Sequence, residues 1–361
     1  MSKARDLANF SDVAPDIGRK NLIINGAMQV AQRGTSDTVD GGGWDYVIDR
    51  FCALGQSSAG VFTYSQDSDA PAGFQKSLKV AVTTADTSLA SGDIYTIRHT
   101  IEGYNSAHLD FGSADAKTVT LSFWVKSSLT GTFGGALNSE GNNRSYAFTY
   151  SISAANTWEY KTITIAGDTT GTWGTTNSHG VRITWGLGVG STYSGTAGSW
   201  AGSEYFSATG ATSVIGTASA TWQITGVQLE VGSVATPFEH RSYGEEDALC
   251  KRYFYSHYNG ANIYWGIGYM YSTTQMYSHI KFPVAMRATP TLSYGGTTTM
   301  YANGAASTNN AGSIVIGPAS NTSDNNKYMM LGDSTMNEVS GEVGGLYSTG
   351  SGAKMQFDAE L

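Results

Sequence analysis

Strict alternation of apolar and polar residues is the feature that most constrains the fold of this chain. Between Val181 and Val189 every odd position is apolar, and the segments 119–125 and 78–82 alternate in the same way. Alternation with period two predicts half-buried strands of antiparallel sheets. No long window shows helical periodicity, and no repeat of fixed length is visible. The sequence therefore predicts an all-β protein, and the lack of a repeat argues against a propeller or a parallel β-helix.

Turn-forming segments separate these strands. Glycine accounts for 45 of the 361 residues and proline for only 6, which suits tight turns between short strands. Charged residues make up 14% of the chain, against roughly 25% in average soluble domains. The apolar phase switches between Ile224 and Val227, which predicts a β-bulge near Thr225 and Gly226. Short strands joined by such turns favour a sandwich.

One helix is predicted, from Ser242 to Phe254. Ser242 and Glu245 have the spacing of a capping box. Acidic residues in the first turn and basic residues in the last turn complement the helix dipole. The apolar face of this helix comprises Leu249, Cys250, Tyr253 and Phe254. The two cysteines, Cys52 and Cys250, lie far apart in the chain, and we interpret both as buried thiols.

The chain is long enough for two hydrophobic cores. We expect an attachment arm at 1–20, a jelly-roll sandwich at 21–240, a short helical joint at 241–255 and a smaller β-sandwich or barrel at 256–361. In the last of these, one strand is predicted to bury Ile263, Trp265, Ile267, Tyr269 and Tyr271, and the following strand is predicted to bury Met276, Ile280 and Phe282.

Several classes of function lack support in the sequence. The net charge is -8 and no basic run occurs, so we expect no nucleic-acid partner. No stretch is long and apolar enough to predict membrane insertion. The six histidines show no zinc-ligand spacing, and no serine-nucleophile or phosphate-loop motif is convincing. We therefore expect a protein that is not an enzyme, although a carboxylate pair for glycoside hydrolysis would be invisible in the sequence.

Two pairs of carboxylates could supply oxygen ligands to calcium. These are Asp67 with Asp69 and Asp45 with Asp49. A full calcium shell needs about 6–8 oxygens, and no glycine-punctuated loop supplies them. Solvated turns are the preferred interpretation, so no metal site or other cofactor is predicted, with calcium as the one possibility left open.

Aromatic residues among neutral polar ones are frequent in the distal part. Rigid amphipathic rings with amide and hydroxyl neighbours suit uncharged sugars. Strand phase places Tyr264, Gln275, Tyr277 and His279 on the outward face, and we take these four as candidate glycan-binding residues. Candidate contacts between subunits are Leu249, Tyr253 and Phe254 of the helix and the outward-facing Trp124.

Three groups of segments resemble phage tail-fibre-like virion proteins. They are Ala4–Asn9 and Gly18–Gly34 with Ile48–Phe51, then Ile224–Tyr243 running into Glu245–Phe254, and finally Phe282–Leu292. The resemblance implies a first domain like a carbohydrate-binding module, a distal domain that faces the host, and a homotrimer on the virion. No catalytic residue is implied by it.

The leading hypothesis is a non-enzymatic phage tail fibre or spike subunit that binds a host-surface glycan. Residues 1–20 would dock on other tail proteins, and residues 256–361 would touch the receptor. The alternatives are a glycan-cleaving tailspike enzyme and a decoration fibre of the head or neck.

Deletion of residues 1–20 is expected to leave the domains folded, because this segment carries few core-forming residues. The truncated protein should be missing from assembled particles, as measured by quantitative blotting of purified virions. A full complement of truncated protein on the particles would contradict the attachment-arm hypothesis.

Overall fold

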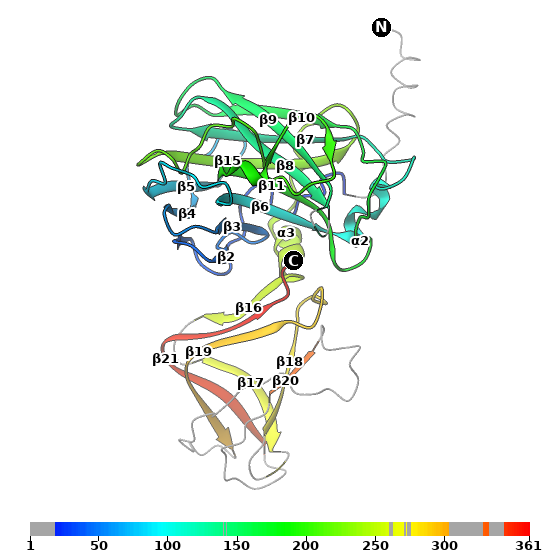
Figure 1. Cartoon of the computed structure of the whole chain (residues 1–361). Helices are drawn as coiled ribbons and strands as arrows, with labels where there is room; N and C mark the ends of the chain where they lie inside the picture. Colours follow the sequence, from blue (N-terminus) through cyan, green and yellow to red (C-terminus); the bar gives the residue numbers. More distant parts are fainter. Residues whose placement is uncertain are drawn as a thin grey trace.

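The computed structural model describes residues 19–139, 141, 143–259, 263–270, 272, 276–302, 328–331 and 343–361. Within them, a β-sandwich is followed by a short helix and a second group of strands (Figure 1). Antiparallel pairing dominates both groups, which confirms the all-β prediction. Of the predicted arm, only Arg19 and Lys20 lie among the described residues, and the domain limits stay predictions.

Two antiparallel sheets form the sandwich. The first runs in the order β1 (Ser36–Val39), β4 (Val61–Asp67), β5 (Ser77–Thr84), β15 (Thr221–Val231), β7 (Val119–Ser127) and β10 (Glu159–Ile165). The second runs β13 (Trp200–Ala201), β9 (Ser145–Ile152), β8 (Gly131–Ser139), β11 (His179–Val189), β6 (Ile94–Glu102), β3 (Phe51–Gly55) and β2 (Gly43–Tyr46). The facing sides share one apolar core that includes the fully buried Trp185 and Trp222.

The predicted bulge lies in β15. Its pairing with β7 shifts register between Thr225 and Gln228. Gly226 has a φ of 61°, and a Cβ there would come within 2.6 Å of the Phe74 ring. Glycine is therefore needed for both the backbone conformation and the close approach.

Helix α3 (Tyr243–Lys251) begins as predicted and ends early. The Ser242 hydroxyl accepts a hydrogen bond from the Glu245 amide at 3.3 Å, as an N-cap should. The predicted end at Phe254 is wrong, because Phe254 already pairs with Asp358 as the first residue of strand β16 (Phe254–Asn259). The prediction of buried thiols is confirmed for both cysteines.

The distal strands are arranged around one long strand. Their order is β16, β21 (Val343–Asp358), β17 (Ile263–Met270), β18 (Met276–Lys281) and β20 (Tyr328–Leu331), with β19 (Thr291–Ala302) also pairing with β21. All these pairs are antiparallel. Among the described residues, β21 alone pairs with three strands of this group and so holds them together.

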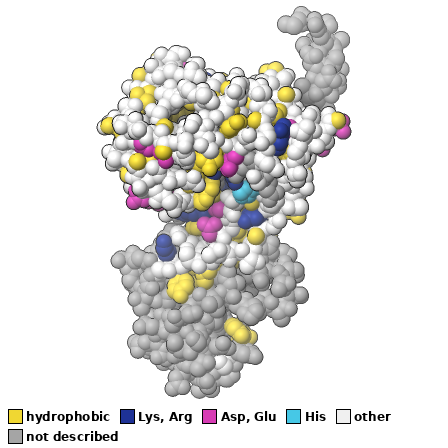
Figure 2. All heavy atoms as spheres, in the orientation of Figure 1, with side chains coloured by type: hydrophobic (Ala, Val, Ile, Leu, Met, Phe, Trp, Pro, Cys, Tyr) yellow, Lys and Arg dark blue, Asp and Glu magenta, His cyan; other side chains and the backbone are white. Residues whose placement is uncertain are grey.

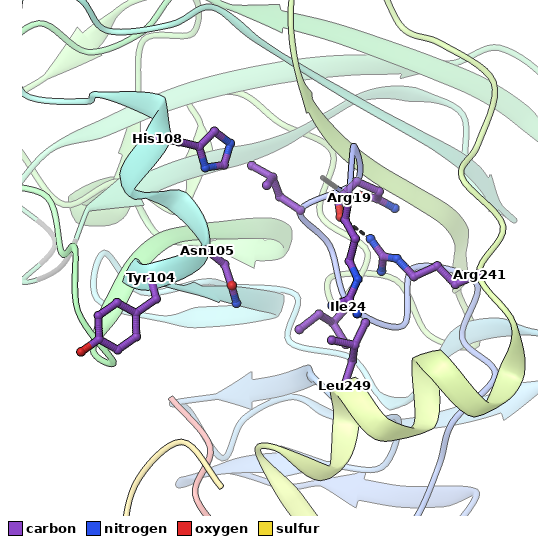
Figure 3. Close-up of a pocket in the computed structure, with 9 residues that line it drawn as sticks. Arg19, Ile24, Tyr104, Asn105, His108, Arg241 and Leu249 are labelled. Carbon is purple, nitrogen blue, oxygen red and sulfur yellow. Dashed lines mark hydrogen bonds between the residues drawn. The ribbon is translucent and has the colours of Figure 1, made fainter. Parts of the chain in front are cut away.

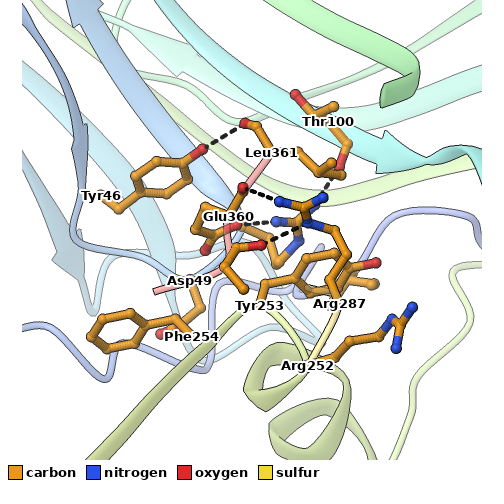
Figure 4. Close-up of polar contacts among 12 residues, drawn as sticks. Tyr46, Asp49, Thr100, Arg252, Tyr253, Phe254, Arg287, Glu360 and Leu361 are labelled. Atoms are coloured by element: carbon orange, nitrogen blue, oxygen red, sulfur yellow. Dashed lines mark hydrogen bonds and ion pairs between the residues drawn. The ribbon is translucent and has the colours of Figure 1, made fainter. Parts of the chain in front are cut away.

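Buried charges join the distal strands to the sandwich (Figure 4). Arg50 forms an ion pair with Glu360, and their side chains are 1% and 6% exposed. The Arg50 guanidinium lies 3.5 Å from the centre of the Tyr253 ring. Nearby, Arg33 binds Asp358 at 3.0 Å. Residues 359–361, which follow β21, are therefore held against the sandwich.

A second set of contacts fixes the end of α3. Glu102 of β6 accepts hydrogen bonds from Arg252 at 2.5 Å and from the Tyr253 hydroxyl at 2.7 Å. Burial by itself would raise the pKa of Glu102, but these hydrogen bonds lower it below its ordinary value. Arg287 donates to the backbone oxygens of Ala359 and Glu360 at 2.7 and 2.8 Å.

The helices that the structure describes include none with the length and apolar character needed to cross a membrane.

Glu360→Gln is expected to destabilise the protein by about 3–5 kcal/mol, because removing one partner of a buried ion pair leaves the other charge uncompensated. Denaturant unfolding would measure the loss. The matched control is Asp247→Asn, which breaks the more exposed pair with Lys251 in α3 and should cost no more than about 0.5 kcal/mol. Equal losses for the two variants would contradict a structural role for Arg50 and Glu360.

Candidate functional site

An exposed aromatic pair marks one face of the distal strands. Tyr269 of β17 and Tyr277 of β18 are directly opposite in the antiparallel ladder. Their ring centres are 6.1 Å apart with the planes nearly perpendicular, an arrangement that aromatic rings prefer. Tyr269 is 48% exposed, and Tyr277 is half-buried. The pair therefore presents ring surface to the solvent.

Apolar side chains extend this face on both sides of the pair. Ile267, two positions before Tyr269, is 77% exposed. Val343 of β21 pairs with Tyr269 from the other side and is 65% exposed. We call Ile267, Tyr269, Tyr277 and Val343 the distal face. Contiguous exposed apolar groups of this kind commonly mark a binding surface.

The opposite side of the same strands is buried. Met270 and Ile280 are 1% and 3% exposed, and Phe282 just beyond β18 is 3% exposed. Since successive residues of a strand point to opposite sides, the inward Ile280 places Tyr277 outward. The predicted facing of Tyr277, Ile280 and Phe282 is confirmed.

The predicted facing of β17 is wrong for Ile267 and Tyr269, which point outward instead of inward. The cause is a bulge: Tyr264 pairs with Tyr347 of β21, whereas Gly266 pairs with its neighbour Leu346. One extra residue in β17 inverts the facing of every residue after it. Sequence phase did not reveal this, although Gly266 lies at the bulge, because the apolar residues at odd positions continue unbroken from Ile263 to Tyr271.

The four predicted glycan-binding residues are described to different extents. Tyr277 lies on the distal face as expected. Tyr264 and His279 lie within β17 and β18, but their side chains fall outside the described residues, as does Gln275 altogether. The residues that the sequence analysis missed are Ile267, Tyr269 and Val343.

The proposed subunit contacts fall into two groups. Tyr253 and Phe254 are 0% and 3% exposed, and they contact Arg50 and Arg33 of the same chain. Their burial leaves neither ring available to a second copy. Leu249 and Trp124 are half-buried, and Trp124 packs against the Tyr160 ring with centres 5.3 Å apart.

Three of the four carboxylates considered for calcium, Asp49, Asp67 and Asp69, are engaged by other groups. Asp67 and Asp69 form ion pairs with Lys79 and Lys126. Asp49 is fully buried and accepts hydrogen bonds from the Gln32 amide and side chain at 2.7 and 2.8 Å. Burial raises the pKa of Asp49 to about 6. Within the described ranges, no three metal-ligating side chains gather at one point.

Comparison with known proteins gives distant structural likenesses. No family model and no curated protein matches the sequence. The enzymatically active domain of tailspike protein 4 from bacteriophage CBA120 matches at 13% identity and a TM-score of 0.32, covering 59% of this chain and 21% of that chain. This chain thus spans only 21% of the length of that tailspike structure.

Two carbohydrate-binding modules match over their full length. TmCBM61 in complex with β-1,4-galactotriose covers 59% of this chain and 100% of its own, with 9% identity and a TM-score of 0.30. The family 11 module from Clostridium thermocellum, in complex with a mixed-linked tetrasaccharide, covers 56% and 99%, with 12% identity and a TM-score of 0.27. At these scores the likenesses carry no conclusion about this chain.

Proposed function

We propose that this chain is a non-enzymatic subunit of a phage tail fibre or spike that attaches the particle to a glycan on the host surface. The observation that carries the proposal is the exposed Tyr269–Tyr277 pair of the distal face. Rings exposed in this way offer apolar contact to the face of a sugar while their hydroxyls reach polar groups. The resemblance of residues 18–34 and 224–243 to tail-fibre-like proteins supports a place on the virion.

The composition of the distal strands favours binding over cleavage. Neither β17 nor β18 contains an aspartate or a glutamate. Glycoside hydrolysis ordinarily needs two carboxyl groups on either side of the scissile bond. A sugar bound against β17 and β18 would contact aromatic rings and hydroxyl groups of these strands, but no carboxyl group of either strand.

The surface character of the sandwich is consistent with a neutral ligand. Charged side chains are sparse on the visible face, where some lie at the sides of the sandwich and others where it meets the distal strands (Figure 2). Long-range attraction of a charged receptor would need an extended field of one sign. Direct contacts between the protein and the glycan, made by several copies of the chain at once, then supply most of the affinity.

Tyr269→Ala and Tyr277→Ala are expected to reduce adsorption of particles to host cells while costing no more than about 1 kcal/mol of stability, the size of one cross-strand pair. The matched control is Ile280→Ala on the buried side of β18, which should destabilise by about 2–5 kcal/mol. Adsorption kinetics and thermal unfolding measure the two effects.

Normal adsorption by both tyrosine variants would exclude the distal face as the receptor site. Shortened oligosaccharides after incubation with host capsule would instead establish the tailspike-enzyme alternative. Immunogold labelling confined to the head or neck would establish the decoration-fibre alternative.

A homotrimer is expected in solution, because attachment fibres gain avidity from linked copies and closed rotational symmetry limits growth. Light scattering should give about three times the chain mass of 38.2 kDa. A monomer at micromolar concentration that also fails to assemble on virions would contradict this expectation.

A further inference from the structure

A cavity of about 300 Å³ lies in the sandwich, apart from the distal face (Figure 3). One side is formed by helix α2 (Gly103–Ser106) and the 3-10 turn η1 (Ala107–Leu109), which contribute Asn105 and His108. The other side is formed by residues 19–24, Arg241 and Leu249 of α3. Its volume is at the lower end of small-molecule sites, which span about 300–1,000 Å³, so it suits one sugar unit.

The cavity combines an apolar wall with one buried donor that lacks a partner. Leu22, Ile24 and Leu249 provide the apolar wall. Arg241 has a side chain that is 4% exposed, and its Nε–H makes no hydrogen bond within the part of the chain that the structure describes. Burying a donor without a partner is unfavourable. An acceptor on a bound ligand would satisfy it.

Charge balance indicates that this ligand is neutral. Arg19 forms an ion pair with Glu245 at 3.0 Å. Arg241 contacts Glu239 and Glu246 at 3.2 and 3.3 Å. Since both arginines at the cavity already have carboxylate partners, no excess positive charge is left to bind an acidic sugar.

We propose that this cavity binds an N-acetylated hexosamine unit of the glycan. The acetamido group matches the two halves of the site, because its methyl can lie against Leu22, Ile24 and Leu249 while its carbonyl oxygen accepts the Nε–H of Arg241. Asn105 and His108 are exposed at the rim and can bind the ring hydroxyls. The proposal rests on glycan binding as the function, and it names the sugar class at a site separate from the distal face.

The test uses the full chain and two probes that differ only at the second carbon, N-acetylglucosamine and glucose. Saturation-transfer NMR should show strong transfer to the acetyl methyl of N-acetylglucosamine and none to glucose. Asn105→Ala and His108→Ala remove exposed groups and should leave the fold intact. Each should weaken N-acetylglucosamine binding by roughly tenfold or more, about the effect of one lost 1.4 kcal/mol contact.

Val234→Ala is the matched control, because Val234 is 74% exposed, lies outside both the cavity lining and the distal face, and should leave N-acetylglucosamine binding unchanged. Equal transfer to both sugars, no transfer to either, or normal binding by the Asn105→Ala, His108→Ala double variant would overturn the proposal. Failure of the proposed attachment function would appear separately, as adsorption that is unchanged in the tyrosine variants.

Discussion

The buried ion pair between Arg50 and Glu360 is the contact on which the placement of the distal strands against the sandwich depends. Two charges removed from water are costly unless good geometry and further hydrogen bonds compensate them. Here Arg50 also donates to the backbone oxygen of Thr100 and lies over the Tyr253 ring. The ion pair therefore stabilises one placement of the distal strands against the sandwich. A small shift would separate Arg50 from Glu360 and leave both charges buried without a partner.

Ring faces also cover two other largely buried guanidinium groups. Arg33 lies 3.4 Å from the centre of the Phe254 ring, and Arg98 lies 4.2 Å from that of Phe206. Burial, followed by the nearby charge of Arg182, lowers the pKa of Arg98 to about 10. Ring faces offset part of the cost of burying a cation. A chain with few charges thus uses several of its arginines inside, and its surface is left rich in hydroxyls and aromatic rings.

This division has a consequence for attachment. Under the proposed function the distal face must keep a fixed orientation, and the contacts made by Arg50, Arg33 and Arg287 hold the distal strands against the sandwich. The proposed sites then present preorganised rings and donors, which lowers the entropy cost of binding. Weak contacts of that kind gain strength only when several copies act together.

The sequence by itself determined the features whose causes are local. Period-two alternation fixed the strands of the sandwich, the Ser242 side chain fixed the start of α3, and the glycine at 226 fixed the bulge in β15. The outward position of Tyr277 followed in the same way from alternation within its own short strand. These features could be predicted because each depends on residues a few positions apart.

Only the tertiary structure decided the features that depend on distant partners. The bulge in β17 turns Tyr269 outward, and it is seen only in the register of β17 against β21. The cavity beside Arg241 is assembled from segments that lie more than 200 positions apart. The ion pair of Arg50 with Glu360 spans 310 positions. Alternation reports which side of a strand is apolar, but the register of pairing and the partners of buried charges depend on how the whole chain packs.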